Sequence, residues 1–453
     1  MLFERIESTG LAHYSYIIGD LKNAVVIDPR RDCDVYIRLA TKEGLGISHI
    51  LETHRNEDYV IGSVELASRT GAEILHADGE LDYLYGQPVE DGQKIRVGRY
   101  TIEAMSTPGH TPGSMSYLLH DPSGAPWIVF TGDALFAGDV GRTDLPGLDL
   151  MTEMTELLYD SLVNKLLTLG DEVIVCPGHG AGSVCGVDIA DRPVTTIGIE
   201  RKTNPKLQFT DKDEFIEKVG KEHERPPYFR KMEELNVAGA PILGSLPVPA
   251  PLTPGEFANA SEKASILDTR MELSFGAAHV PGSLNIWLDG LASFAGWFLT
   301  YDHPILLVNE TNDPEETARI LIRMGYDNLP GFLSGGMLKW HMSGKESGSV
   351  QTLTVQKLCE HLDKGEKPWI LDVRSQGEID SGGVIPDGHH IHITRLPEKI
   401  EDIPRDKPIT VFCGSGLRSM VAASYLKREG WSYLTVILGG LSGWKSSSCP
   451  IQL

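Results

Sequence analysis

Four short segments in the first 180 residues carry histidine and aspartate in contexts typical of metal ligands. They are His54 with Asp58 in "THRNEDYV", His110 in "STPGHTPGS", Asp133 in "FTGDALF" and His179 in "CPGHGAGS". Each segment follows a run that predicts a β-strand, so all of them can lie on loops at one sheet edge. Glycine and proline bracket three of the segments, which speaks against unrelated structural histidines. The pattern therefore predicts a metal site.

A second candidate site lies in "ITVFCGSGLRSMVAASYLKREG" near the C-terminus. This stretch predicts a buried strand, a glycine-rich loop from Cys413 to Arg418, and a helix beginning near Ser419. Loop N–H groups, a helix N-terminus and a guanidinium would then surround the thiol. Such surroundings stabilise an anion bound on the sulfur. A lone cysteine is usually a buried structural residue, but here the loop, the arginine and the helix start coincide.

The elements that must position these residues divide the chain into several parts. At 453 residues the chain predicts about three domains. The first 235 residues alternate strand-like runs with helical segments such as "MTEMTELLYDSLVNKLLTL". The stretch 236–250 is rich in proline, glycine and alanine and predicts a linker.

An internal repeat follows the linker. "SILDTR" returns as "WILDVR", and Asp268 and Asp372 within these two runs are separated by 104 residues. "LSGGMLKW" and "ILGGLSGW" keep the same spacing, with Trp340 and Trp444 at equivalent positions. Two related α/β domains with parallel sheets are therefore predicted, at 251–347 and 348–453.

The Cys413 loop resembles the active-site loop of rhodanese sulfurtransferases, and this resemblance implies that Cys413 carries a persulfide beside Arg418. "LDVR", with Asp372 and Arg374, and the closing "GGLSGW" match the rhodanese pattern as well. The loop is one residue shorter than the Cys-x5-Arg loop of cysteine phosphatases, so a phosphatase is the weaker interpretation. The last domain is expected to be an active rhodanese.

The middle domain lacks the nucleophile. Subtracting the 104-residue offset from Cys413 gives Asn309, and the following residues include Asp313, Glu315 and Glu316. These carboxylates would repel a persulfide. The middle domain therefore resembles an inactive rhodanese that is kept for packing or docking.

The order and context of the histidine segments resemble the metallo-β-lactamase superfamily over about residues 1–235, which implies an αββα sandwich. In dinuclear members the motif His-x-His-x-Asp-His supplies three histidines, but Asn56 and Tyr59 occupy two of those positions here. Metal one would keep His54, His110 and Asp133. Two imidazoles and one carboxylate form the facial triad typical of non-haem Fe(II) oxygenases. One Fe(II) per chain is expected, with zinc as the alternative.

Within the superfamily this reduced ligand set resembles persulfide dioxygenases. Their pattern also matches "GDVGRTD", in which Arg142 either contacts the carboxylate of a thiol substrate or forms a structural salt bridge. Asp58 and His179 are expected beside the metal as groups that orient ligands or water. Cys185 is expected either to reach the same cavity or to be an inert buried thiol.

The expected function is therefore oxidation of a low-molecular-weight persulfide by O2 to sulfite, with Cys413 exchanging sulfur between persulfide, sulfite and thiosulfate. The carrier thiol could be glutathione or coenzyme A. Two alternatives stay open: a zinc thioester hydrolase of the glyoxalase II type, and a metal-free scaffold that presents the rhodanese.

Bulk properties limit the partners and the compartment. A formal net charge of −22 argues against nucleic-acid and anionic-membrane partners. No signal peptide or membrane span is evident, and six cysteines without a CxxC pair suggest free thiols. A cytoplasmic protein is expected, and a homo-oligomer is compatible with the sequence.

Overall fold

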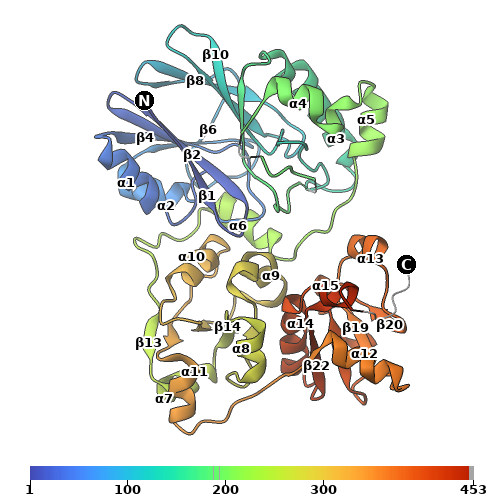
Figure 1. Ribbon diagram of the computed structural model, residues 1–453. Helices are drawn as coiled ribbons and strands as arrows, with labels where there is room; N and C mark the ends of the chain where they lie inside the picture. The colour runs from blue at the N-terminus through green and yellow to red at the C-terminus, as the bar shows by residue number, and fades with distance from the viewer. Residues whose placement is uncertain (187, 193, 448–453) are drawn as a thin grey trace. The chain divides into compact units, whose positions relative to one another are not determined.

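The computed structural model describes residues 1–186, 188–192 and 194–447, and it divides the chain into two compact units (Figure 1). The first unit comprises 1–246 with 322–325, and the second comprises 247–321 with 326–453. Within the described ranges, none of the helices combines the length and the hydropathy needed to cross a membrane.

The first unit contains two six-stranded sheets. The first sheet consists, in order, of β1 (Leu2–Ser8), β2 (His13–Asp20), β3 (Asn23–Ile27), β4 (Gly46–Leu51), β5 (Glu73–His76) and β6 (Gln87–Pro88). The second consists, in order, of β12 (Thr195–Thr196), β11 (Ile174–Pro177), β10 (Pro126–Gly132), β9 (Met115–His120), β8 (Tyr100–Ser106) and β7 (Lys94–Val97).

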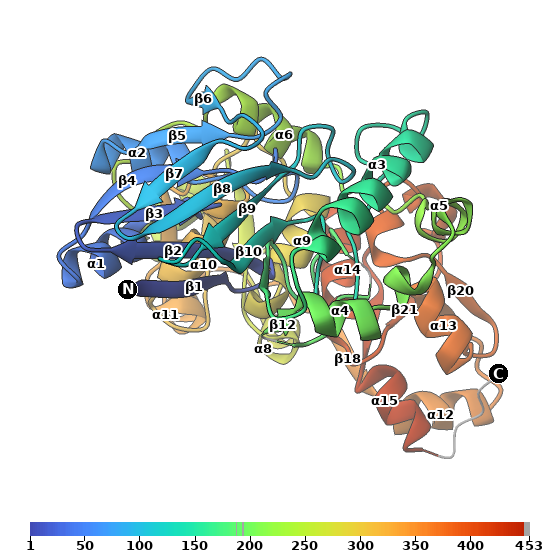
Figure 2. The ribbon, with the colours of Figure 1, turned by 90° about the horizontal axis from the view of Figure 1, so that it is seen from above.

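Helices cover the outer faces of the two sheets. The helices are α1 (Asp34–Lys42), α2 (Ser63–Thr70), α3 (Met151–Asn164), α4 (Ile197–Thr203), α5 (Lys212–Val219) and α6 (Phe229–Ala238). Figure 2 shows α1 and α2 beside the first sheet and α3 to α5 beside the second. Side chains such as Ile18, Ile102 and Phe130 form one buried cluster between the sheets, which is the centre of an αββα sandwich.

The second unit contains two five-stranded sheets with the same strand order and only parallel pairings. The first is β13 (Ala250–Leu252), β17 (Gly331–Leu333), β16 (Ile305–Val308), β14 (Ser265–Asp268) and β15 (Leu284–Asn285). The second is β18 (Gln351–Thr354), β22 (Leu434–Leu438), β21 (Ile409–Phe412), β19 (Trp369–Asp372) and β20 (Gly388–His390). The repeat in the sequence is thus a repeat of topology.

Both repeats place α-helices between successive strands, except that the β20–β21 connection of the second repeat has 3-10 turns at Ile393–Arg395 and Ile400–Asp402. The first has α7 (Pro254–Ser261), α8 (Glu272–Ala277), α9 (Leu291–Phe298), α10 (Glu315–Arg323) and α11 (Gly336–Met342). The second has α12 (Val355–Asp363), α13 (Gln376–Gly382), α14 (Leu417–Arg428) and α15 (Gly440–Lys445). The predicted fold class, a sandwich followed by two α/β domains with parallel sheets, is confirmed.

A buried ion pair is repeated at the end of one strand in each of these domains. Arg270 Nη2 lies 2.7 Å from Asp268 Oδ2 and also donates to the Ala278 carbonyl. Arg374 Nη2 lies 2.6 Å from Asp372 Oδ2 and donates to the Gly383 carbonyl. The pair therefore joins the strand to the end of the following helix.

The sequence expectations differ from the structure in two details. Helix α14 begins at Leu417, two residues before the predicted Ser419, because Gly416 already turns the chain into the helix. The expectation of free thiols holds for Cys33, Cys176, Cys185 and Cys413 but is wrong for Cys359, which is disulfide-bonded.

Replacing Arg374 by alanine is expected to destabilise the second unit by roughly 3–5 kcal/mol, because Asp372 would be left buried without its partner. Urea unfolding followed by tryptophan fluorescence measures this, since six of the seven tryptophans lie in that unit and only Trp127 lies in the other. The control is Lys357→Ala, which removes an exposed pair with Glu360 and should cost about 0–1 kcal/mol. Equal losses in both variants would contradict a structural role for the buried pair.

Candidate metal centre and sulfur-transfer loop

The predicted metal-binding residues come together at the ends of strands from both sheets of the first unit. His54 follows β4, His110 follows β8, Asp133 follows β10 and His179 follows β11. All four side chains are buried. Gly141 lets a neighbouring loop reach this cluster, because a Cβ atom there would lie 1.9 Å from the Asp133 carbonyl oxygen.

Two imidazole nitrogens face one carboxylate oxygen. His110 Nε2 lies 3.5 Å and His54 Nε2 3.8 Å from Asp133 Oδ2. These separations are long for hydrogen bonds but suit groups that share an ion about 2.1 Å from each ligand. Neither Nε2 atom has a hydrogen-bond partner among the described residues, although both are buried. Burying such atoms is unfavourable unless something binds them.

The other ring nitrogens fix which tautomer each histidine adopts. His110 Nδ1 lies 2.9 Å from the Arg142 carbonyl oxygen, which can only accept a hydrogen bond. The Thr53 hydroxyl donates to Asp28 and therefore accepts from His54 Nδ1, at 2.8 Å. Both Nδ1 atoms thus carry the proton, and both Nε2 lone pairs point at the cluster.

The electrostatics favour the same protonation states. Burial lowers the pKa of His54 to about 3 and lowers the pKa of His110 below its ordinary value. Burial alone would raise the pKa of Asp133, but the neighbouring histidines, His179 foremost, outweigh it and hold this pKa well below its usual range. Neutral imidazoles and an ionised carboxylate are the forms that bind metal.

Asp58 and His179 adjoin the first group through Asp133. His179 Nδ1 lies 2.8 Å from Asp133 Oδ1, and its Nε2 lies 3.0 Å from Asp58 Oδ2. Burial opposes a charge on His179, but the two carboxylates prevail and raise its pKa well above the ordinary value. Tyr59 stacks on His13 at 3.9 Å between ring centroids. Burial raises the pKa of the Tyr59 hydroxyl, so the phenol stays neutral.

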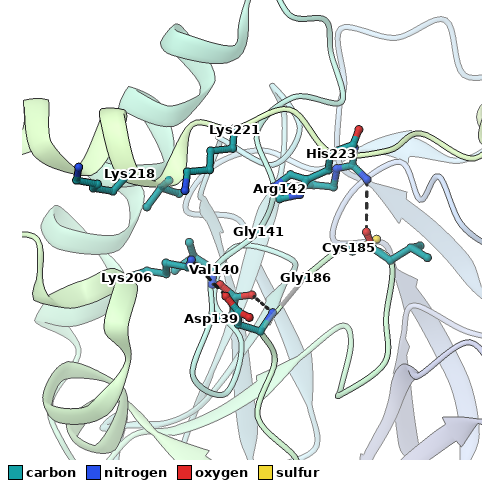
Figure 3. A pocket seen from close by; sticks show the side chains of 13 residues that line it. Asp139, Val140, Gly141, Arg142, Cys185, Gly186, Lys206, Lys218, Lys221 and His223 are labelled. Atoms are coloured by element: carbon teal, nitrogen blue, oxygen red, sulfur yellow. Dashed lines mark hydrogen bonds and ion pairs between the residues drawn. The ribbon is translucent and has the colours of Figure 1, made fainter. Parts of the chain in front are cut away.

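A pocket opens beside the buried histidine and aspartate residues, and Cys185 lines the pocket while also lying next to these residues. Its sulfur lies within 4.8 Å of ligand atoms of His110 and Asp133, and also of Asp58 and His179. Burial raises the pKa of the Cys185 thiol well above its ordinary value. Figure 3 shows lysines on one side of the pocket and Cys185 on the other; these lysines are Lys206, Lys218 and Lys221.

Arg142 also lines the pocket, but its donors are engaged within the protein. It makes two bonds to Asp144, at 2.7 and 2.8 Å, and donates to the carbonyls of Val184, His223 and Glu224. These contacts hold the loop that carries the His110 acceptor against the pocket wall.

The Cys413 loop lies at the end of β21. Cys413 is buried, and the Gly416 N–H donates to its sulfur at 3.1 Å. Gly440 has a φ of +45° and lies so close that a Cβ atom there would be 2.2 Å from the Cys413 carbonyl oxygen. Arg418 forms two bonds to Glu378, at 2.5 and 2.6 Å, and holds the pKa of that carboxyl down at about 2.

Asn309 occupies the equivalent position after β16. Its amide nitrogen donates to the hydroxyls of Thr269 and Thr317, at 3.0 and 2.7 Å. The adjoining pocket is lined by the carboxylates of Asp289, Glu310, Asp313 and Glu316. The loop thus keeps its place while its chemistry changes.

Comparison with known families decides the classification. The model of the metallo-beta-lactamase superfamily matches residues 8–179, and that of the rhodanese-like domain matches 253–343 and 354–447. A hydroxyacylglutathione hydrolase (GloC) from Haemophilus influenzae is 30% identical, with 43% of this chain and 91% of the relative covered. The chain belongs to the metallo-β-lactamase superfamily, and it carries two rhodanese-like domains.

Two further relatives were found for this metallo-β-lactamase chain. The mitochondrial persulfide dioxygenase ETHE1 of Homo sapiens is 32% identical, with 48% of this chain and 79% of the relative covered. The crystal structure of a metallo-beta-lactamase from Staphylococcus aureus subsp. aureus COL superposes with a TM-score of 0.65 at 30% identity. The superposition covers 74% of this chain and 98% of the Staphylococcus aureus chain, so the structural similarity extends beyond the sandwich.

The metallo-β-lactamase domain holds one residue that the sequence reasoning missed. Glu57 lies between Asn56 and Asp58 in the altered motif, and its ligand atom lies within 4.8 Å of those of His54 and His110. Burial raises the pKa of this carboxyl to about 8. The sequence feature that could have identified Glu57 is its position directly after Asn56, which replaces the second histidine of the motif. The donor atoms present therefore fit a bound metal ion.

Proposed function

We propose that this protein is an iron-dependent persulfide dioxygenase joined to a thiosulfate sulfurtransferase. The observation that carries the proposal is the pair of neutral imidazoles facing Asp133 in a motif that lacks the other two histidines. The relative named as a persulfide dioxygenase supports this assignment. The Cys413 loop in the same chain could transfer a sulfur atom to the sulfite that the oxidation produces.

The proposed oxidation is balanced without another reductant. A persulfide R–S–SH, O2 and water give the thiol R–SH, sulfite and two protons. The terminal sulfur is oxidised from the sulfane level to sulfite, the S–S bond breaks, and O2 accepts the electrons. His54, His110 and Asp133 would hold Fe(II), which would supply the one-electron chemistry that reaction with O2 requires.

The chain's own residues prepare this site. Thr53 and the Arg142 carbonyl fix the two histidine tautomers, so that the lone pairs need no rearrangement before binding. His179 links Asp58 to Asp133 and orients the carboxylate. We assign Arg142 as a positioning residue, because Asp144 and backbone carbonyls already occupy its donors. Cys185 lies where the sulfur of an entering substrate would pass.

Cys413 would act in the second reaction. Its sulfur attacks a sulfane sulfur, the donor leaves as a thiol or sulfite, and a persulfide forms on Cys413. Sulfite then takes the outer sulfur, which gives thiosulfate and returns the thiol. The Gly416 N–H already points at the Cys413 sulfur, and the N-terminus of α14 lies beside it, so negative charge there is stabilised.

The pocket favours an anionic carrier thiol. Three lysines, Lys206, Lys218 and Lys221, line it together with Asp139 and Asp188, and Lys206 pairs with Asp188 at 3.5 Å. The lining is thus cationic overall, although the chain carries a net charge of −22. Glutathione offers carboxylates and coenzyme A offers phosphates, and both groups suit lysine. The lysines would hold the far end of the carrier while its sulfur reaches Cys185 and the metal cluster.

A zinc-dependent thioester hydrolase is the second candidate, because the hydrolase relative is 30% identical and covers the same part of the chain. A zinc-bound hydroxide attacking a carbonyl is the chemistry of that class. The missing motif histidines weaken this candidate, since they remove ligands of a second metal.

Anaerobically purified protein is expected to contain about one iron per chain and to consume O2 when glutathione or coenzyme A persulfide is added. The variant His110→Ala should lose this O2 uptake, because one of three ligands is gone. An oxygen electrode and metal analysis provide the measurements. Zinc in place of iron, together with thioester hydrolysis and no O2 uptake, would refute the dioxygenase and establish the hydrolase.

The variant Cys413→Ser is expected to reduce thiosulfate sulfurtransferase activity to the uncatalysed rate and to leave O2 uptake unchanged. Serine keeps the shape of the loop but cannot carry the sulfane sulfur. The reciprocal control is His110→Ala, which should keep sulfur transfer from thiosulfate. Retention of both activities by Cys413→Ser would show that the sulfur carrier is another residue.

The double variant Lys218→Gln, Lys221→Gln is expected to raise KM for coenzyme A persulfide by about tenfold, equivalent to about 1.4 kcal/mol, and to leave kcat unchanged. A small neutral alkyl persulfide should show no change in KM. Lys212→Gln is the matched control, because Lys212 belongs to the same helix as Lys218 but pairs with Asp160 outside the pocket. Equal KM values for the double variant and this control would place the carrier elsewhere.

A further inference from the structure

The two oxygens of the buried Glu57 carboxylate have different surroundings. Oε1 accepts a hydrogen bond from Arg55 Nη2 at 3.1 Å, and this guanidinium also binds Glu233 at 3.0 Å. Oε2 has no hydrogen-bond partner among the described residues, and it lies 3.9 Å from His110 Nε2. One oxygen is therefore anchored while the other points into the metal cluster.

Three unpartnered, buried atoms meet at this point. They are Glu57 Oε2, His54 Nε2 and His110 Nε2, and the ligand atoms of the three residues all lie within 4.8 Å of one another. When the Glu57 carboxyl is ionised, its oxygen is repelled by the two imidazole lone pairs, because all three are electron-rich. A cation between them converts this repulsion into three bonds.

Asn56, which stands where the motif has its second histidine, does not fill this role. Its side-chain amide donates to the backbone carbonyl of His54 at 3.3 Å. The neighbouring Glu57 offers a carboxylate oxygen that has no hydrogen-bond partner among the described residues.

We propose that Glu57 is a metal ligand that replaces the second histidine of the motif. The ion is then held by two imidazoles and two carboxylates, from His54, Glu57, His110 and Asp133. Arg55 binds the other oxygen of Glu57 and fixes the orientation of this ligand. In other metal sites a carboxylate often does the same for a ligating histidine. This inference rests on the metal site of the proposed function but not on the reaction assigned to it.

The replacement has two chemical consequences. Two carboxylates balance the charge of a divalent ion, whereas a set of histidines with one carboxylate leaves a net positive charge. In an octahedral ion, four protein ligands leave two positions open, which is the number that a persulfide and O2 require together. The change thus preserves room for both reactants.

The test uses the full-length chain, freed of metal and reloaded anaerobically. Fe(II) affinity is measured by competition with a chromogenic chelator, and Co(II) is added separately as a spectroscopic probe. Glu57→Gln should weaken Fe(II) binding by on the order of 100-fold or more, beyond the roughly 10–100-fold typical of groups that only orient a ligand. It should also change the visible Co(II) spectrum, because the donor set differs.

Glu233→Gln is the matched control. This change removes the second carboxylate that binds the Arg55 guanidinium but takes no group from the metal cluster. The Fe(II) affinity and the Co(II) spectrum should therefore stay as in the wild type. The double variant Asn56→His, Glu57→Ala restores the histidine of the motif and should recover Fe(II) affinity to within about tenfold of the wild type. This recovery separates a lost ligand from a misfolded site.

Wild-type affinity and an unchanged Co(II) spectrum in Glu57→Gln would overturn the inference. So would a loss equal to that of Glu233→Gln with an unchanged spectrum, since Glu57 would then act only through Arg55. A wild-type chain that binds neither ion would overturn the proposed metal site itself, which is a different result from either of these.

Discussion

Ionisable side chains buried together without enough protein partners are the feature on which this structure depends. They are His54, Glu57, Asp58, His110, Asp133 and His179. Part of the group is satisfied internally, since His179 binds both aspartates. The buried atoms of this group without a hydrogen-bond partner include His54 Nε2, Glu57 Oε2 and His110 Nε2. The ligand atoms of these three residues lie within 4.8 Å of one another, and they mark where a cation would be stabilised. The sandwich contributes four strand ends at one edge, and hydrogen bonds from its loops fix the tautomers.

The second unit contains two copies of one parallel-sheet fold that differ in the loop after the central strand. Both repeats keep the strand order and the buried aspartate–arginine pair, and the loop after the central strand occupies the equivalent place in each. In one copy that loop carries Cys413 with an N–H pointed at its sulfur. In the other, Asn309 binds two threonine hydroxyls and carboxylates line the pocket. Stability resides in the shared scaffold, and chemistry resides in the loop.

Much of this could be read from the sequence because the signals are local. Strand-like runs ending in glycine-bracketed histidines predicted the edge at which His54, His110 and Asp133 meet, and the 104-residue offset identified both Asn309 and the repeated topology. Other features depend on long-range geometry. Glu57 is held by Arg55, whose guanidinium also binds Glu233, 178 positions further along the chain, and the engagement of Arg142 follows from carbonyls near residue 223. No local pattern encodes such contacts.

The central claim is that the altered motif holds one metal ion instead of two. X-ray absorption fine structure at the iron edge of anaerobically loaded protein tests it directly. The account predicts one shell of nitrogen and oxygen ligands near 2.1 Å, of the kind that imidazole and carboxylate give, and no heavier scatterer beyond it. A metal–metal distance of about 3.5–4 Å, as in two-metal sites, would contradict the account.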